Sequence, residues 1–186
     1  MADLKGKRIA ILATDGFEQV ELTEPKKALE QAGATVHVIA PKAGEIKGFK
    51  HLDPGESVKV DKTLDQAKPS DYDNLVLPGG VANPDALRMD EKAVAFVKGF
   101  LDSGKTIGAI CHGPWTLIEA GGVRGRTLTS WPSLKTDIRN AGGTWVDQQV
   151  VSDKGLITSR KPDDLKAFNQ KFIKEFAAGS RLRAAS

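Results

Sequence analysis

Short, uninterrupted apolar runs that alternate with longer segments of helical periodicity restrict the fold of this chain more than any other feature of its sequence. Such runs are typical of parallel strands buried on both faces, and the periodic segments between them are typical of amphipathic helices. Their alternation predicts a mostly parallel sheet covered by helices on both sides, which is a three-layer α/β/α sandwich. The runs are residues 8–13, 35–40, 74–77 and 106–110, with helices expected over 17–32, 91–101 and 112–120.

The rest of the chain extends the same pattern. Glycine and proline interrupt short β-like pieces in residues 44–62, which predicts a small antiparallel excursion that we place at an edge of the sheet. With 186 residues, 40% of them hydrophobic and 27% charged, the chain is expected to form one globular domain, 1–186, with a frayed tail at 180–186. Further strands are expected at 127–129, 145–151 and 155–158, and further helices at 133–140 and 163–177.

The charge and the cysteine content argue against several classes of function. The net charge of +3 is small and the basic residues are mixed with acidic ones, so we expect no specific nucleic-acid partner. A single cysteine cannot form an intrachain disulfide and suits a reducing compartment. No secretory signal or membrane-spanning window is visible, so we expect a cytoplasmic protein without membrane contact. No glycine-rich phosphate motif follows the first strand, and we expect neither a cofactor nor a metal.

Cys111 stands where the strand 106–110 ends and the next helix begins. The segment Ala109-Ile110-Cys111-His112-Gly113-Pro114 resembles a nucleophile elbow, in which small neighbours allow a sharp strand-to-helix turn. At a helix start, unpaired backbone N–H groups and the positive end of the helix dipole favour a thiolate, which predicts a lowered thiol pKa. The alternative is an inert core cysteine. Because a core cysteine would more naturally lie inside the strand, we interpret Cys111 as a reactive nucleophile.

Other polar groups could meet Cys111 at the same sheet edge. His112 is the candidate base, although neighbouring residues of a regular helix point about 100° apart and would not face each other. Glu18 and Glu21 follow the first strand and could reach the same rim, while favourable interaction with a helix dipole is the alternative for Glu18. Gly79 and Gly80 end a neighbouring strand and could donate N–H groups to an oxyanion, or could form a simple turn.

Several motifs together resemble the PfpI-type intracellular cysteine peptidases, a family within the superfamily that includes the parkinsonism-associated protein deglycase. The resemblance implies a flavodoxin-like domain of the class I glutamine amidotransferase-like type, with Cys111 as nucleophile, Glu21 hydrogen-bonded to its sulfur and His112 as the peptidase-type partner. In such peptidases a neighbouring subunit supplies the carboxylate that orients the histidine, which implies a homodimer or a hexamer. The motifs are Phe17-Glu18-Gln19-Val20-Glu21, Leu77-Pro78-Gly79-Gly80 and the elbow, and the likeness continues through residues 124–126, 129–132 and 159–165.

Asp85 matches the position of that orienting carboxylate. The family pattern has glutamate there, and aspartate is shorter by one methylene group. The segment Asn83-Pro84-Asp85 is also typical of a helix N-terminus with Asn83 as its cap, so both roles stay open. Trp131 stands where the deglycase carries a histidine, which places the chain nearer the peptidase-like branch.

Two functions of different classes follow from these residues. The first is a stress-related cysteine hydrolase, in which Cys111 attacks a carbonyl of a glyoxal or methylglyoxal adduct on protein or nucleotide, or of a peptide bond. We favour adduct repair because Asp85 leaves the peptidase triad incomplete. The second is a redox-sensing protective protein, in which Cys111 is oxidised to sulfenic or sulfinic acid and Glu21 holds the oxidised sulfur. A glutaminase is disfavoured because no histidine follows His112.

Overall fold

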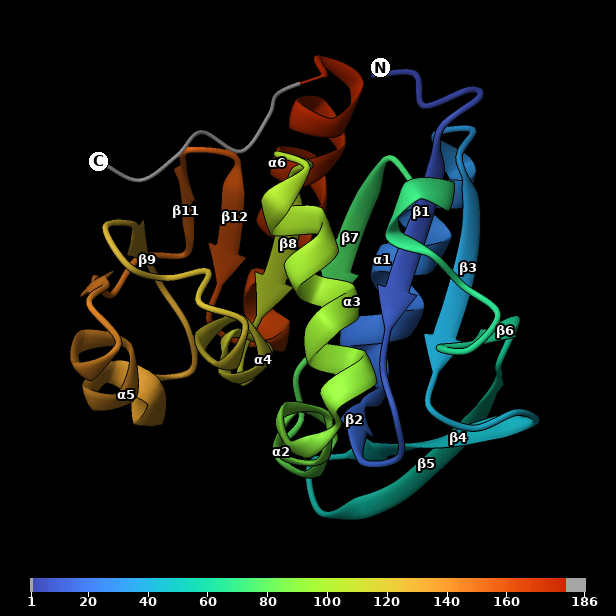
Figure 1. The fold of residues 1–186 in the computed structure, drawn as a ribbon, viewed down its shortest axis with the longest axis horizontal. Coiled ribbons are helices and arrows are strands. Elements are labelled where there is room, and N and C mark those ends of the chain that lie inside the picture. Colours follow the sequence, from blue (N-terminus) through green and yellow to red (C-terminus); the bar gives the residue numbers. More distant parts are fainter. Residues whose placement is uncertain (1, 180–186) are drawn as a thin grey trace.

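A seven-stranded sheet forms the centre of the protein, which we describe from a computed structural model covering residues 2–179 (Figure 1). Its strand order is β11-β12-β8-β7-β1-β3-β6, and every neighbouring pair is parallel except β11 and β12. The frayed tail expected at 180–186 lies outside the described residues. The strands are β1 (Arg8–Leu12), β3 (Thr35–Ala40), β6 (Lys62–Thr63), β7 (Asn74–Leu77), β8 (Ile107–Ile110), β11 (Val150–Asp153) and β12 (Leu156–Ser159).

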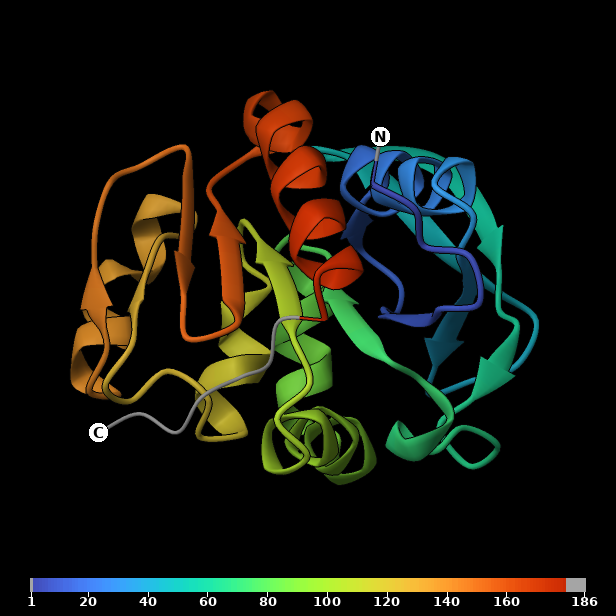
Figure 2. The ribbon, with the colours of Figure 1, turned by 90° about the horizontal axis from the view of Figure 1, so that it is seen from above.

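Helices cover both faces of this sheet, as Figure 2 shows from above. Residues of β1 alternate between the two cores: Ile9 and Ile11 pack with α1 and α6, whereas Ala10 and Leu12 pack with α3 and α4. This alternation is the two-residue period of a strand buried on both sides, and it confirms the predicted three-layer α/β/α architecture. The helices are α1 (Gln19–Gln31), α2 (Ala82–Met89), α3 (Glu91–Asp102), α4 (Pro114–Glu119), α5 (Lys135–Asn140) and α6 (Leu165–Ala177).

The antiparallel excursion predicted at 44–62 is confirmed as the pair β4 (Glu45–Lys50) and β5 (Asp53–Lys59). Its predicted place is wrong, because the hairpin belongs to a separate three-stranded sheet with β2 (Phe17–Glu18). The two edge strands of the main sheet are β6 and β11 instead. For the same reason the helix expected to begin at Phe17 begins two residues later, since Phe17 and Glu18 pair with Gly48 and Phe49.

The strand predicted at 145–151 is in fact two pieces in different sheets. β10 (Thr144–Trp145) pairs in parallel with β9 (Thr127–Leu128), and the main sheet resumes only at β11. The 3₁₀ turns Pro132–Leu134 and Pro162–Asp164 precede α5 and α6, so these two helices begin later than expected. A third 3₁₀ turn, Pro69–Asp71, precedes β7. Among residues 2–179, no helix combines the length and apolarity needed to cross a bilayer.

The strands β1, β7, β8 and β12 are mutually parallel, so their carboxyl ends lie side by side at the same end of the main sheet. The loops that follow β7 and β8 carry Gly79-Gly80 and Cys111, and the loop after β1 leads into Glu18 and Glu21. Open α/β sheets bind their ligands at this kind of edge. The fold therefore gathers the residues that the sequence analysis selected.

Candidate active site

Cys111 follows the last residue of β8 in a left-handed backbone conformation, with φ of 61°. This region is sterically unfavourable for a residue with a side chain, so the surrounding contacts must hold it. The Cys111 N–H donates to the Ser159 carbonyl at 3.1 Å, and the Cys111 carbonyl accepts from the Trp131 N–H at 2.9 Å. A Cβ atom on Gly113 would lie 2.5 Å from the Leu77 carbonyl oxygen, so only glycine fits there. The turn therefore has the tight, strained geometry expected of a nucleophile elbow.

Glu21 lies beside the sulfur in the first turn of α1 and is completely buried. Its Oε2 accepts the Gly79 N–H at 2.9 Å. Its Oε1 is buried and has no donor among the described residues apart from the Cys111 thiol, which interacts with the Glu21 carboxyl group. Burial of an oxygen away from water destabilises an ionised carboxylate, because the hydrogen bond to Oε2 compensates its charge only in part.

Burial controls the protonation of both groups. Burial, with a smaller contribution from the charge of Glu18, raises the pKa of Glu21 to about 8, although hydrogen bonds from the Gly79 N–H, the Cys111 side chain and the Gly80 N–H oppose the rise. Burial also raises the pKa of the Cys111 thiol, and a charged Glu21 adds to this, whereas the backbone N–H groups of Gly80 and His112 lower it. The lowered thiol pKa predicted from the helix start is therefore wrong as stated. Cys111 is only 6% exposed, and desolvation outweighs the dipole of the six-residue α4.

His112 faces the sulfur despite being the next residue in the chain. Its Nδ1 lies 3.2 Å from the Cys111 Sγ, because the left-handed backbone at Cys111 departs from helical geometry. Two tryptophans hold the ring, with Trp131 stacked at 6.0 Å between ring centroids and Trp115 edge-on at 5.1 Å. Burial lowers the pKa of His112 to about 4, so the imidazole is neutral near pH 7.

Glu18, Gly79 and Gly80 meet at the same edge but face different groups. The Glu18 Oε2 accepts the His51 N–H at 3.0 Å, which ties the start of α1 to the β4–β5 hairpin. The Gly79 N–H is occupied by Glu21, so Gly79 positions that carboxyl group. The Gly80 N–H interacts with both Glu21 and Cys111. Of the two glycines predicted to donate to an oxyanion, Gly80 is therefore the one whose N–H faces the sulfur.

Asp85 lies in the first turn of α2 and is exposed to solvent. No hydrogen bond joins it to His112 within residues 2–179. The helix begins at Ala82 and its N-cap is Val81, two residues before the predicted cap, so Asn83 is inside the helix. A role for Asp85 in orienting a histidine would therefore require a second subunit.

Asn83 has a structural role that the sequence analysis missed. Its side chain is fully buried, accepts the Thr14 N–H at 2.8 Å and donates to the carbonyls of Pro78 and Gly79 at 3.1 and 3.0 Å. These bonds join the loops that follow β1 and β7. An asparagine shortly after Gly79-Gly80 was the sequence feature that could have indicated this bridging role. The segment Asn83-Pro84-Asp85 was instead interpreted as a helix N-terminus.

We expect Asn83→Ala to lower the free energy of unfolding by about 2–4 kcal/mol, because it removes three hydrogen bonds and leaves the Thr14 N–H and the Pro78 carbonyl without them. Urea unfolding measures this directly. The exposed Asn140 at the end of α5 provides the control, since Asn140→Ala should change stability by less than about 0.5 kcal/mol. Equal losses in the two variants would contradict the assigned role.

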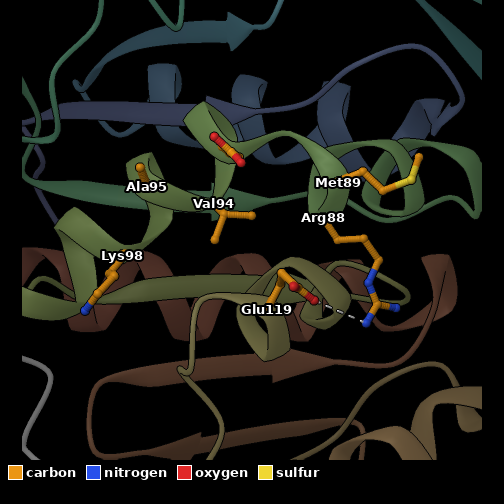
Figure 3. Close-up of a pocket in the computed structure, with 7 residues that line it drawn as sticks. Arg88, Met89, Val94, Ala95, Lys98 and Glu119 are labelled. Atoms are coloured by element: carbon orange, nitrogen blue, oxygen red, sulfur yellow. Dashed lines mark ion pairs between the residues drawn. The ribbon is translucent and has the colours of Figure 1, made fainter.

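A separate open hollow of about 680 Å³ lies on the helices α2, α3 and α4 (Figure 3), and Cys111 does not line it. Arg88 and Glu119 form an ion pair of 3.7 Å at its rim, and Met89 is 76% exposed. None of the predicted site residues lines it. The chemistry of the predicted residues is therefore not located in this hollow.

Comparison with known protein families gives a match over most of the chain. A family model described as the DJ-1/PfpI family matches residues 7–175. The chain belongs to the DJ-1/PfpI family. The family resemblance predicted from the sequence is confirmed.

Two curated relatives in this DJ-1/PfpI family cover nearly the whole chain. Protein/nucleic acid deglycase 2 of Escherichia coli is 46% identical over 175 residues, which are 92% of this chain and 99% of that protein. YraA of Bacillus subtilis, named as a candidate cysteine protease, is 44% identical over 167 residues, 90% of this chain and 96% of that protein.

Solved structures of the same superfamily share the fold. DJ-1beta of Drosophila melanogaster superposes with a TM-score of 0.83 at 30% identity, over 92% of this chain and 90% of that one. A two-domain protein of Anabaena variabilis with DJ-1/ThiJ/PfpI-like and ferritin-like domains gives a TM-score of 0.87 at 35% identity, over 97% of this chain. The present chain spans about half of that protein, 51%.

Proposed function

We propose that this member of the DJ-1/PfpI family is a cysteine hydrolase that removes glyoxal and methylglyoxal adducts from amino groups of proteins or nucleotides. The observation that carries the proposal is the pairing of the Cys111 thiol with the buried carboxyl group of Glu21. Two acidic groups that share a desolvated site hold one negative charge between them. When the Glu21 carboxyl group is ionised and the thiol is neutral, moving the thiol proton onto that carboxylate produces a thiolate and a neutral carboxylic acid without adding charge to the site.

The thiolate is the form that attacks carbonyls. When it attacks the adduct, a carbon–sulfur bond forms and the carbonyl electron pair moves to oxygen. The N–H groups of Gly80 and His112 are the donors that would stabilise this oxyanion, and the proton held by Glu21 is available to the departing nitrogen. Water then breaks the carbon–sulfur bond and regenerates the thiol, so for a methylglyoxal adduct the net reaction consumes one water and yields the free amine and a 2-hydroxy acid. It needs no external oxidant, because one carbon of the adduct is oxidised while its neighbour is reduced.

Peptide hydrolysis is the second candidate, and the 3.2 Å contact between His112 and the sulfur favours it. A cysteine–histidine peptidase needs a group that orients the histidine. If Asp85 of another subunit has this role, the peptidase site exists only in a homodimer or hexamer. Redox sensing is a further alternative, because the buried Oε1 of Glu21 could hydrogen-bond an oxidised sulfur.

The deciding experiment offers the purified protein a methylglyoxal-modified peptide, the same peptide unmodified, and a modified nucleotide. Mass spectrometry then follows both the loss of the adduct mass and any backbone cleavage. We expect the modified substrates to return to their unmodified masses, and protein blocked with iodoacetamide to leave them unchanged. Cleavage of the unmodified peptide without adduct loss would favour the peptidase. If the protein catalyses neither reaction, the proposal of a hydrolase is rejected.

A further inference from the structure

The ring of His112 is fixed from three sides by groups of its own chain. Its Nδ1 faces the Cys111 sulfur at 3.2 Å, and its Nε2 faces the hydroxyl oxygen of Ser133 at 3.4 Å. Trp131 is stacked on one face with an interplanar angle of 23°, and Trp115 meets the ring at 64°. Both ring nitrogens therefore have a polar partner without any contribution from another subunit.

Ser133 is available for this contact because it has no other side-chain hydrogen bond in the described chain. It lies in the 3₁₀ turn Pro132–Leu134, directly after Trp131, whose N–H is bonded to the Cys111 carbonyl. One short segment thus binds the elbow through its backbone, packs on the imidazole through Trp131 and reaches the far ring nitrogen through Ser133. The position of the hydroxyl is coupled to that of the nucleophile.

The charged groups near the ring have other partners. Arg88 lies over the ring of Trp115 at 5.4 Å, and Asp137 accepts the indole N–H of Trp115 at 2.9 Å. Glu21, on α1, interacts with the sulfur and the Gly79 and Gly80 N–H groups. The contact partner of Nε2 is therefore a hydroxyl group, whereas a peptidase-type histidine has a carboxylate there.

A hydroxyl group and a carboxylate select different tautomers. A carboxylate can only accept, so it keeps the ring hydrogen on Nε2 and leaves Nδ1 bare toward the sulfur. A hydroxyl can also donate, so Nε2 can accept from it while Nδ1 carries the hydrogen. A thiolate needs a donor at Nδ1. A neutral imidazole supports the thiolate only when Nε2 is an acceptor.

We propose that Ser133 is a positioning residue that donates its hydroxyl hydrogen to the Nε2 of His112 and so holds the ring hydrogen on Nδ1, facing the Cys111 thiolate. This inference rests on the proposed function, because it assigns the thiolate as the working form of the site. It replaces the intersubunit carboxylate with a hydroxyl of the same chain. Ser133 acts through His112 and does not itself contact the reacting sulfur.

The matched variants are Ser133→Thr, which keeps the hydroxyl, and Ser133→Val, which has nearly the same shape as the threonine variant but no hydroxyl. Nitrogen-15 NMR of the His112 ring at pH 7 reports the tautomer, and iodoacetamide alkylation at the same pH reports the thiolate. We expect the parent and Ser133→Thr to carry the hydrogen on Nδ1. Ser133→Val should shift it toward Nε2 and slow alkylation about 3- to 10-fold, the value of one hydrogen bond.

Equal tautomers and alkylation rates in the Thr and Val variants would overturn the proposal. So would a tautomer change in Asp85→Asn that is absent from Ser133→Val, because the orienting group would then be the carboxylate. Neither measurement uses an adduct as substrate. A protein that fails to remove adducts but shows the expected tautomer change would therefore refute the proposed function and leave the role of Ser133 standing.

Discussion

Replacement of Cys111 by alanine is expected to reduce adduct removal at least about 10³-fold, because no other group in the site can form the covalent bond to the carbonyl carbon. The described residues contain no second cysteine; of the nearest titratable groups, Glu21 is assigned to proton transfer and His112 to hydrogen bonding with the thiolate. The residual rate should come only from binding and from the backbone N–H donors. Mass spectrometry of the adduct under single-turnover conditions measures the loss.

Cys111→Ser provides the matched control for shape. Serine keeps a hydrogen-bonding atom of similar size in the elbow, but its hydroxyl group does not ionise by transfer to a carboxyl group near pH 7. Both variants should unfold at urea concentrations close to that of the parent, since neither removes the backbone bonds to Ser159 and Trp131. Adduct removal within tenfold of the parent rate in the folded alanine variant would assign the chemistry to another residue.

Much of the fold could be predicted because the parallel strands are buried on both faces and leave uninterrupted apolar runs in the sequence. Residues 35–40 and 74–77 were expected as strands and are β3 and β7 with the same bounds. Short pairings are less visible, since Phe17-Glu18 and Thr144-Trp145 contribute only two residues each to their small sheets. Such strands form because a partner is present in space, which local periodicity does not record.

The location of the site could also be predicted, whereas its electrostatics could not. Strand ends marked by glycine placed Cys111, Gly80 and Glu21 at one sheet edge, because parallel strands share an edge for their carboxyl ends. The thiol pKa depends on desolvation, which is a property of the complete packing around the sulfur and is not visible in the residues beside it. The roles of Asn83 and Ser133 likewise depend on loops that are distant in sequence.

Glu21→Gln is the second substitution with a large expected effect, because it removes the group that takes up the thiol proton. The amide has nearly the same shape and can keep the contact with the Gly79 N–H through its oxygen. We expect adduct removal to fall by about 10²-fold or more, the usual contribution of a positioned proton-transfer group. Alkylation of Cys111 at pH 6 should slow as well. Parent rates in both assays would show that the thiol does not share its proton with Glu21.

The same substitution should change how stability depends on pH. Burial raises the pKa of Glu21 from 4.5 to about 8, so between these values the folded state binds more protons than the unfolded state. The free energy of unfolding must then fall as pH rises through this range, with no penalty below pH 4.5 and the full penalty above pH 8. Glutamine does not titrate. The advantage of Glu21→Gln over the parent should therefore grow by at least about 2 kcal/mol between pH 5 and pH 8.

Urea unfolding at a series of pH values measures this difference. Glu24→Gln is the matched control, because Glu24 lies exposed on the same helix and its loss should leave the pH trend of the parent in place. The stability measurement is independent of any substrate, so it tests the buried carboxyl group itself. If the parent and Glu21→Gln lose stability in parallel as pH rises, Glu21 is already ionised in the folded protein. A carboxylate of ordinary pKa is too weak a base to take the proton from the buried Cys111 thiol, and the thiolate would need another origin.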